Sequence, residues 1–277
     1  MSKAMTGSEG LKAVLIFLHL PKAAGSTLAR IIERQYGQGN VLRLYESIRG
    51  EEVATLSPER KENLRALIGH FYFGAHIYVT RPATYVTILR DPIKRIISHY
   101  YYVRREPSHY LYPAAQQLSL CEYVIHCGKA EPNNDQTRLL AGSEHALEDG
   151  TWSAEMLPAA KVNLRDHFSV VGLVEEFDRS LILFKRVLGW RSPFYIKQNV
   201  SRRHAGNGGI PEEAIRVIRT YNEMDIHLYA YARQLLDEQA RLDGESLERE
   251  LRLFRTMNAI FGRLNGIKAA AAGRLRA

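Results

Sequence analysis

The fold is decided by one stretch near the start of the chain, AVLIFLHLPKAAGSTLARII, residues 13–32. Its first six residues form a continuous apolar run of strand length, which is typical of a parallel strand covered on both faces. Apolar side chains then recur at helical spacing between Leu28 and Ile32, and Gly37 follows the pattern as a helix end would. We therefore expect a buried strand, a tight loop and a helix that Ser26 caps.

A second unit of the same kind lies further along the chain. Tyr85 to Leu89 is an aromatic and β-branched run, and Asp91-Pro92 then opens a pattern of helical spacing. Strands that alternate with helices favour an α/β fold with right-handed crossovers. We expect a P-loop-like layered fold, with a mainly parallel central sheet flanked by helices and a C-terminal helical extension. The other elements that the patterns predict are strands at 41–45 and 169–174, a helix from 57 onward, and helices at 153–168, 177–188 and 211–242.

The composition is that of an ordinary globular protein. The chain has 277 residues, of which 45% are hydrophobic and 25% charged, and its apolar runs are far shorter than the roughly 20 residues of a membrane span. Two cysteines form no disulfide framework, so we expect a cytoplasmic protein. The patterns predict one catalytic domain over 1–243 and a basic helical extension over 244–277 that is not a separate domain.

The basic character is concentrated at the C-terminus. The chain carries 38 Lys and Arg against 30 Asp and Glu, a net charge of +8, yet six of the basic residues and none of the acidic ones lie in 251–277. The rest of the chain is close to neutral, so anion binding there must come from the placement of a few side chains. For the tail, the sequence leaves open a basic amphipathic helix that contacts an anionic membrane surface or a partner, and a plain terminal helix.

The loop after the first strand has the make-up of an anion site. Backbone N–H groups at the start of a helix lack intrahelical partners, so those from Gly25 to Thr27 can converge on a bound anion. Lys22 adds a positive charge, and Gly25 allows the main chain to approach closely. The spacing is not that of a Walker A loop, because the lysine precedes the glycine. The other interpretation is an ordinary turn with a solvated lysine.

The second unit predicts a second anion site. Arg90 ends its strand and Ser98 follows on the helix, and an arginine can bind a phosphate through two parallel hydrogen bonds. In an open parallel sheet the carboxyl ends of neighbouring strands share one crevice, so the two sites can hold the two ends of one nucleotide. For Asp91 we prefer a helix cap or an ion pair with Arg95 to a chemical role.

Together these residues resemble the sulfotransferases that use 3′-phosphoadenosine 5′-phosphosulfate (PAPS), especially the carbohydrate branch that includes heparan sulfate 2-O-sulfotransferase. Residues 20–27 look like that family's 5′-phosphosulfate loop, and 89–100 look like its 3′-phosphate block. His70 lies in a segment that resembles the one with the catalytic base, and 172–177 and 195–203 resemble later blocks. The resemblance implies in-line transfer of the sulfuryl group from PAPS to a hydroxyl of a carbohydrate-like acceptor. The nucleotide product would be PAP, and no metal ion would be needed.

The resemblance also implies roles for single residues. Lys22 would neutralise the charge that develops on the leaving 5′-phosphate. Arg90 and Ser98 would bind the 3′-phosphate, and a later basic segment would close over the nucleotide. The donor-binding residues that the resemblance implies are Lys22, Ala23, Ala24, Gly25, Ser26, Thr27, Arg90, Ser98, Arg202 and Arg203.

His70 is the candidate general base. An imidazole with an ordinary pKa near 6.5 can accept the proton of an acceptor hydroxyl at neutral pH. His19 and His76 are rivals for that role, because one lies at the strand end beside the loop and the other follows six residues after His70. The alternative for His70 itself is a partly buried, hydrogen-bonded side chain with no chemical role.

Two further groups of residues are candidates for acceptor contacts. The polar block 133–138 is a weak candidate. The tyrosine run 100–102, with Tyr110 and Tyr112, offers rings on which a sugar can stack, although consecutive residues of a helix cannot all face one site. The identity of the acceptor does not follow from the sequence.

Two other functions stay open at this point. A nucleotide kinase or other phosphoryl transferase would use the same loop, but the chain lacks an Asp in a recognisable magnesium-binding context after a second strand. A non-enzymatic nucleic-acid-binding protein would use the basic tail, and it predicts salt-dependent affinity for nucleic acid without PAPS binding.

Overall fold

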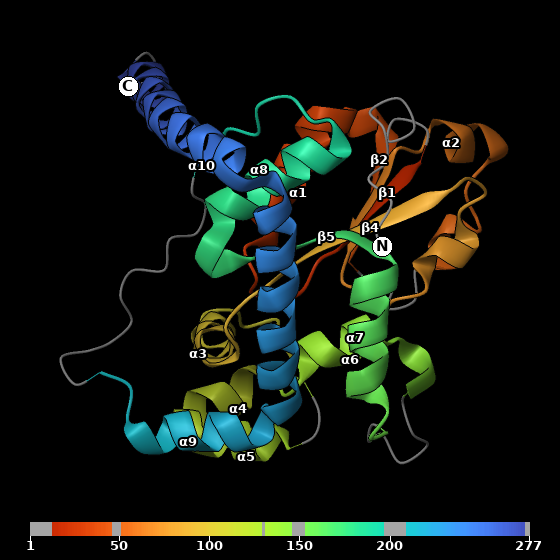
Figure 1. The fold of residues 1–277 in the computed structure, drawn as a ribbon. Coiled ribbons are helices and arrows are strands. Elements are labelled where there is room, and N and C mark those ends of the chain that lie inside the picture. The colour runs from red at the N-terminus through yellow and green to blue at the C-terminus, as the bar shows by residue number, and fades with distance from the viewer. Residues whose placement is uncertain (1–12, 46–50, 129–130, 146–152, 197–208, 275–277) are drawn as a thin grey trace.

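A five-stranded parallel sheet forms the centre of the computed structural model, which describes residues 13–45, 51–128, 131–145, 153–196 and 209–274 (Figure 1). The spatial order of the strands is β2-β3-β1-β4-β5, and every neighbouring pair is parallel. The predicted α/β fold with a mainly parallel central sheet is confirmed. The strands are β1 (Val14–Leu18), β2 (Val41–Leu44), β3 (Ala66–Gly69), β4 (Ala83–Leu89) and β5 (Phe168–Leu173).

Helices connect and cover these strands. Two helices begin with side-chain caps: the Ser57 side chain accepts from the backbone N–H of Arg60 at 3.2 Å, and Asp91, a predicted cap, accepts from that of Lys94 at 2.9 Å. The predicted cap at Ser26 is wrong, because that residue lies in the first turn of α1. The helices are α1 (Gly25–Tyr36), α2 (Pro58–Asn63), α3 (Pro92–Val103), α4 (Tyr112–Gln117), α5 (Leu120–Cys127), α6 (Asp135–Ala141), α7 (Met156–Asp166), α8 (Phe177–Leu188), α9 (Glu212–Tyr221) and α10 (Glu223–Arg274).

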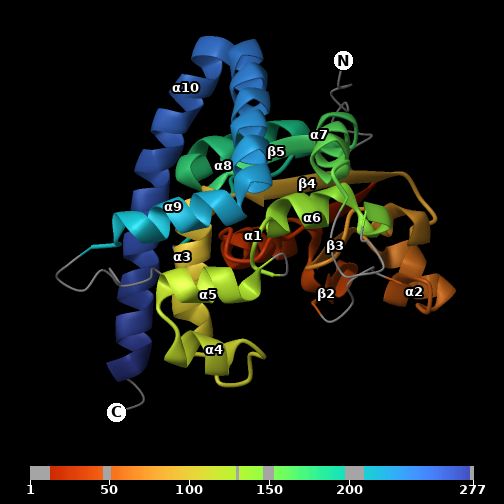
Figure 2. The same ribbon diagram turned by 90° about the horizontal axis from the view of Figure 1, so that it is seen from below.

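The buried side chains form two cores. The larger core surrounds the sheet and includes all five residues of β1, each no more than 1% exposed. The smaller core joins α3, α4, α5 and α9 through residues such as Ile96, Tyr123 and Ile218. Figure 2 shows these four helices grouped at one end of the molecule. α3, which follows β4 directly, therefore connects the sheet to a separate helical layer.

The long C-terminal helix is bent and packs back on the molecule. α10 has a non-helical backbone at Gly244 (φ 52°, ψ −138°), and its two parts run in different directions (Figure 2). Beyond the bend, Leu247, Leu251 and Phe254 are buried in the larger core. The predicted helix over 211–242 is thus two helices, α9 and the first part of α10. Within the described part of the chain, none of the helices combines the length and apolar character of a membrane span.

Candidate active site

Three neighbouring strands end at one edge of the sheet and carry the candidate residues there. β3, β1 and β4 are adjacent and parallel, so their carboxyl ends lie side by side. His70 follows β3, the loop with Lys22 follows β1, and Arg90 follows β4. The topology therefore brings together the candidate base and the two candidate anion sites, as expected for the crevice of an open parallel sheet.

The loop between β1 and α1 has an unusual backbone. Lys22 and Ala24 both have positive φ angles, 63° and 57°, although neither is a glycine. Such residues cost on the order of 1–3 kcal/mol each and persist where the surrounding structure fixes them, often at functional sites. The turn at Ala24 starts α1 directly at Gly25. The N–H groups of Gly25 and Ser26 can then point at a ligand in front of the loop, whereas that of Thr27 donates to the backbone oxygen of Ala24 at 3.1 Å.

Gly25 is needed here because of a histidine. A β-carbon at this position would lie 1.8 Å from the ring of His19, which is 7% exposed and stacks on Phe17 with 5.4 Å between ring centroids. The sequence predicts that Gly25 brings the main chain close to an anion. The structure shows a second reason, the close packing of the His19 ring against the start of α1.

Lys22 and Arg90 join the two anion sites. The Arg90 guanidinium donates through Nη1 to the backbone oxygen of Lys22 at 3.0 Å. Arg90 Nε is buried and has no hydrogen-bond partner among the described residues, so a bound anion would satisfy it. Burial, with smaller effects of Arg90 and Arg105, lowers the pKa of Lys22 to about 8. These cations are therefore held close together in a partly buried place, as a multiply charged anion requires.

A hydrogen bond fixes which ring nitrogen of His70 carries the hydrogen. Its Nδ1 donates to the backbone oxygen of His19 at 2.5 Å, because a carbonyl can only accept. Nε2 of the neutral ring then carries the lone pair. Burial lowers the pKa of His70, against the opposing effect of this hydrogen bond. The ring is thus neutral near pH 7 and able to accept a proton at Nε2.

The two rival histidines have other contacts. His19 Nδ1 lies 3.1 Å from the hydroxyl of Tyr45, and burial lowers its pKa well below the ordinary value. His76 contacts the hydroxyl of Tyr85 through both its backbone N–H at 2.9 Å and its ring Nδ1 at 3.0 Å. His76 thus belongs to the aromatic packing around Tyr85, while His19 supports the loop.

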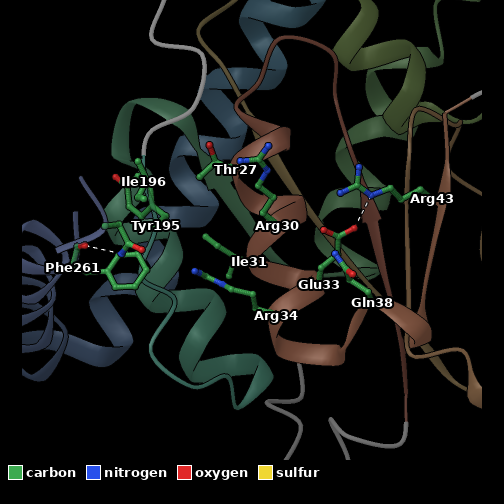
Figure 3. A pocket seen from close by; sticks show the side chains of 11 residues that line it. Thr27, Arg30, Ile31, Glu33, Arg34, Gln38, Arg43, Tyr195, Ile196 and Phe261 are labelled. Atoms are coloured by element: carbon green, nitrogen blue, oxygen red, sulfur yellow. Dashed lines mark hydrogen bonds and ion pairs between the residues drawn. The ribbon is translucent and has the colours of Figure 1, made fainter. Parts of the chain in front are cut away.

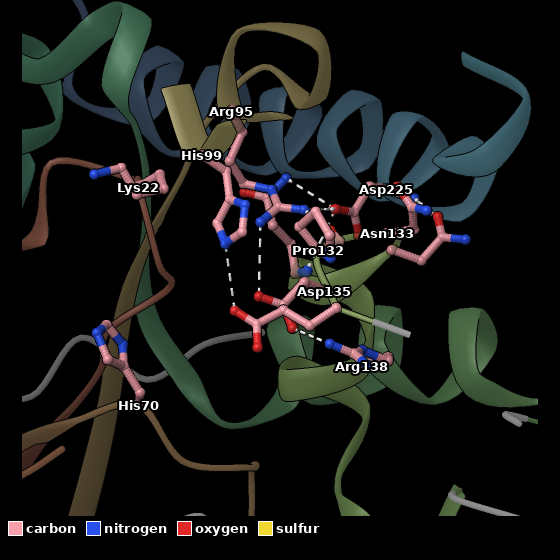
Figure 4. A network of polar contacts seen from close by, with 12 residues as sticks. Lys22, His70, Arg95, His99, Pro132, Asn133, Asp135, Arg138 and Asp225 are labelled. Atoms are coloured by element: carbon pink, nitrogen blue, oxygen red, sulfur yellow. Dashed lines mark hydrogen bonds and ion pairs between the residues drawn. The ribbon is translucent and has the colours of Figure 1, made fainter. Parts of the chain in front are cut away.

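A buried polar network lies behind the second anion site (Figure 4). Arg95 is fully buried and lies 3.6 Å from Asp135 and 3.5 Å from Asp225. Asp225 also accepts from the backbone N–H of Thr137 at 2.8 Å and from its hydroxyl at 2.7 Å. Arg95 therefore pairs with these two carboxylates, and the cap is the role that Asp91 has in the structure.

Gln136 fixes the backbone of Arg90. Its side-chain oxygen accepts from the N–H of Arg90 at 2.9 Å, and its side-chain nitrogen donates to the carbonyl of Arg90 at 3.0 Å. Asn133 and the residues of α6 up to Arg138 are buried, while Asn134 is half-buried. The block 133–138 is thus largely a structural support for the site, and its weak candidacy as a substrate contact gains no support.

A cavity of about 540 Å³ lies along α1 (Figure 3). It begins at Thr27, the last residue of the candidate loop, and extends past Arg30 and Arg34 to Tyr195 and Phe261. The Arg34 guanidinium lies 5.9 Å from the centroid of the Phe261 ring. The exposed Arg30 has no ion-pair partner in the described part of the chain. The cavity thus joins the loop to a basic and aromatic wall.

Two predicted donor-binding features are not joined to the site by observed contacts. Ser98 is half-buried on α3, and its hydroxyl makes no hydrogen bond to another described residue. Arg202 and Arg203 lie outside the described residues. The sequence does not predict the supporting contacts that His19, Tyr102, Gln136 and Asp225 make at the site.

The geometry defines an α/β protein with a cationic, strained loop at the carboxyl ends of its central strands. The chain belongs to the galactose-3-O-sulfotransferase family, whose family model matches residues 66–265. That match begins at β3, so it does not include the loop with Lys22. The assignment of that loop rests on its own residues and geometry.

The curated proteins that the chain resembles include heparan-sulfate sulfotransferases. Human heparan-sulfate 6-O-sulfotransferase 1 is 27% identical over 207 residues, which are 65% of this chain and 49% of that protein. Heparan-sulfate 6-O-sulfotransferase 2 from Danio rerio is 29% identical over 198 residues, or 61% of this chain and 41% of that protein. The chain thus spans about half the length, or less, of these curated relatives. The crystal structure of mouse sulfotransferase SULT7A1 complexed with PAP overlaps 76% of this chain and 64% of that chain, with a TM-score of 0.39 and 14% identity.

Proposed function

We propose that this protein is a PAPS-dependent sulfotransferase that transfers a sulfuryl group to a hydroxyl of a carbohydrate. The proposal rests chiefly on the contact of 3.0 Å between the Arg90 guanidinium and the backbone oxygen of Lys22. Two anion sites that separate motifs predict are adjacent at one edge of the sheet, which suits a donor with charge at both ends. Membership of a sulfotransferase family supports the same reaction.

In this proposal the donor spans the two sites. The loop 22–27 binds the 5′-phosphosulfate through helix N–H groups and Lys22, and Arg90 binds the 3′-phosphate. The unpartnered Nε of Arg90 supports this role. Ser98 is proposed as a further 3′-phosphate contact, and Arg202 and Arg203 as further contacts of the nucleotide. The cavity along α1 is large enough for the nucleoside part, and it shares Thr27 with the loop.

The chemical step is an in-line displacement at sulfur. The acceptor oxygen forms a bond to sulfur while the bond from sulfur to the 5′-phosphate oxygen breaks, and PAP leaves with that electron pair. His70 Nε2 takes the proton of the acceptor hydroxyl. The Lys22 ammonium stabilises the negative charge that develops on the leaving phosphate. The narrower likeness to heparan sulfate 2-O-sulfotransferase, the absence of a metal ion and the cytoplasmic location stay predictions.

Transfer of labelled sulfate tests the proposal. PAPS with labelled sulfur is incubated with the protein and a panel of neutral and acidic oligosaccharides, with the variant Arg90→Ala as a donor-site control. We expect label on at least one oligosaccharide, and a higher KM for PAPS in the variant. Label on none of them, together with phosphate transfer from ATP and Mg²⁺ to an acceptor, would contradict the proposal and favour a phosphoryl transferase.

A further inference from the structure

A strip of aromatic rings begins at Lys22 and leads away from it. The Lys22 ammonium lies over the ring of Tyr102, 3.9 Å from its centroid. The Tyr102 ring meets the His109 ring edge-on at 6.2 Å between centroids, and His109 stacks on Tyr110 at 5.0 Å with the planes 19° apart. We call Tyr102, His109 and Tyr110 the aromatic strip. It starts at the lysine that would contact the transferring group.

The tyrosines of the strip are exposed but held in place. Tyr102 is 36% exposed and Tyr110 is 67% exposed. The Tyr110 hydroxyl donates to Glu131 Oε2 at 3.2 Å, and His109 Nδ1 accepts from the backbone N–H of Leu111 at 3.2 Å. Exposed rings that polar contacts already fix lose little conformational freedom when a ligand stacks on them. Such rings are suited to binding a flat apolar face.

A buried histidine keeps a carboxylate charged beside the strip. His99 is 2% exposed, its Nδ1 lies 3.2 Å from the hydroxyl of Tyr123, and its Nε2 lies 3.5 Å from Glu131 Oε1 (Figure 4). The contact with His99 is the main cause that lowers the pKa of Glu131 to about 2, against the effect of burial. The negative charge of Glu131 also acts on the pKa of His70, so the two groups are within electrostatic range. Glu131 therefore offers only hydrogen-bond acceptors near the candidate base.

We propose that the aromatic strip and Glu131 form the acceptor subsite, and that this subsite takes a neutral pyranose sugar. The inference rests on the proposed function, because the place of the acceptor is defined relative to Lys22 and His70. Aromatic rings stack on the C–H face of a pyranose, and the carboxylate accepts hydrogen bonds from its hydroxyl groups. The charge of Glu131 repels a sugar that carries a carboxylate of its own at this position.

A metal ion is the other ligand that this cluster of side chains could hold. One ligand atom from each of His99, His109 and Glu131 lies within 4.8 Å of the others. The hydrogen bond from Leu111 to His109 Nδ1 argues against it, because Nε2 of the neutral ring then carries the hydrogen and has no lone pair for a metal. The contacts favour the sugar.

Sugar binding to the full chain in the presence of PAP tests this subsite without catalysis. The probes are a neutral galactose-terminated disaccharide and the same disaccharide oxidised at C6 to the uronic acid, titrated by ligand-observed NMR. The proteins are wild type, Tyr110→Ala, Tyr110→Phe and the control Ile77→Ala, which shortens another side chain that is 70% exposed. Thermal melting of each variant checks that it is folded.

We expect the neutral disaccharide to bind wild type more tightly than its oxidised form. Tyr110→Ala should weaken that binding about tenfold, the size of one stacking contact. Tyr110→Phe should weaken it less because the ring is kept, and Ile77→Ala should match wild type. The Kd for PAP should be the same in all four proteins.

Three outcomes would overturn the subsite. The first is equal sugar binding by wild type and Tyr110→Ala, and the second is tighter binding of the oxidised disaccharide. The third is stoichiometric Zn²⁺ binding that His109→Ala abolishes, together with sugar binding that Tyr110→Ala leaves unchanged. Failure of wild type to bind PAP would count against the proposed function instead. The sugar titrations repeated without PAP would then decide on the strip by the same criteria.

Discussion

Burial lowers the pKa values of two side chains at the sheet edge and so favours their neutral forms. Burial and neighbouring cations lower the pKa of Lys22 to about 8, and burial lowers that of His70. For a base a low pKa keeps the ring neutral and ready to accept a proton. For Lys22 the lowered pKa means that the charged ammonium lacks a compensating partner. A bound anion would supply that partner and favour the charged form.

Anion binding should depend on the charge of Lys22. Below pH 8 the ammonium is charged and attracts PAP, whereas above pH 8 it is largely neutral and binding must take up a proton. We therefore expect the affinity for PAP to fall by up to about tenfold per pH unit above pH 8. Calorimetric titrations between pH 6.5 and 9.5 measure this. Lys22→Ala should bind more weakly and without this dependence, and an identical pH dependence in Lys22→Ala would refute the role.

Turnover should depend on the neutral form of His70. Because burial lowers its pKa below 6.5, kcat/KM should stay level down to about that pH and fall only in more acidic solution. His70→Ala should lose that acid limb and about 10²–10⁴-fold of the rate while it keeps its affinity for PAP. His76→Ala is the matched control and should keep the acid limb. If His70→Ala retains full turnover, the base is another residue.

Among single residues, the sequence predicts the place of those that follow a predicted strand. Lys22 and Arg90 follow apolar runs, so local pattern alone places them at strand ends, whereas His70 is singled out only by the resemblance to a known family. Gln136 and Asp225 carry no such signal, because their partners lie 46 and 89 residues away in the chain, respectively. Only the fold shows that they support the site.

Among the elements, the loop between β1 and α1 is the one whose shape the site depends on most. Its glycine faces the His19 ring, so a side chain there must displace either the ring or the helix start. Gly25→Ala should lower the free energy of unfolding by about 1–3 kcal/mol and weaken PAP binding. Urea unfolding and calorimetry measure the two effects. Gly39→Ala, where a β-carbon meets nothing within 4 Å, should be close to wild type, and equal effects of both changes would contradict this account.

The network between α3, α6 and α10 fixes the elements behind Arg90. Asp225 is fully buried and pairs with Arg95, so its neutralisation leaves a buried cation with less compensation. We expect Asp225→Asn to lower the free energy of unfolding by about 3–5 kcal/mol. Asp237→Asn breaks an ion pair whose carboxylate side chain is 43% exposed, and it should cost less than about 1 kcal/mol. Urea unfolding measures the free energy of unfolding of both variants. If Asp225→Asn lost as little as Asp237→Asn, the network would not be cooperative.

Most elements are predictable from their own patterns, and the exceptions have physical reasons. β3 has only four residues, too few for a periodic signal, yet it lies between β2 and β1 and places His70. The break between α9 and α10 occurs at Asn222, whose side chain donates to Asn133 at 3.1 Å and accepts from the N–H of Asn134 at 3.0 Å. That break is a tertiary contact, so helical periodicity alone runs through it.

At the scale of the whole molecule, the sheet follows from alternating strands and helices, but the C-terminus does not follow from composition. The part of α10 beyond Gly244 is basic in sequence, yet Leu247, Leu251 and Phe254 are buried and Glu250 pairs with Lys185 and Arg186. The predicted division at residue 243 stays a prediction, and the family match continues through it to 265.

Two truncated chains test this packing. A chain that ends at Asp243 removes the buried leucines and Phe254, so we expect it to lose its cooperative melting transition or to aggregate. A chain that ends at Asn265 keeps them and should melt within a few degrees of the full chain. Calorimetric melting compares the three. Equal stability of the shorter chain would show that the segment is an independent appendage.

The proposed function depends above all on a donor site built from Lys22 and Arg90 for one nucleotide with phosphates at both ends. Calorimetric titration with adenosine 3′,5′-bisphosphate, and separately with ATP and Mg²⁺, tests it most directly. We predict stoichiometric binding of the bisphosphate, weakened at least about tenfold by Arg90→Ala, and much weaker binding of ATP with Mg²⁺. Binding of ATP with Mg²⁺ and none of the bisphosphate would contradict it.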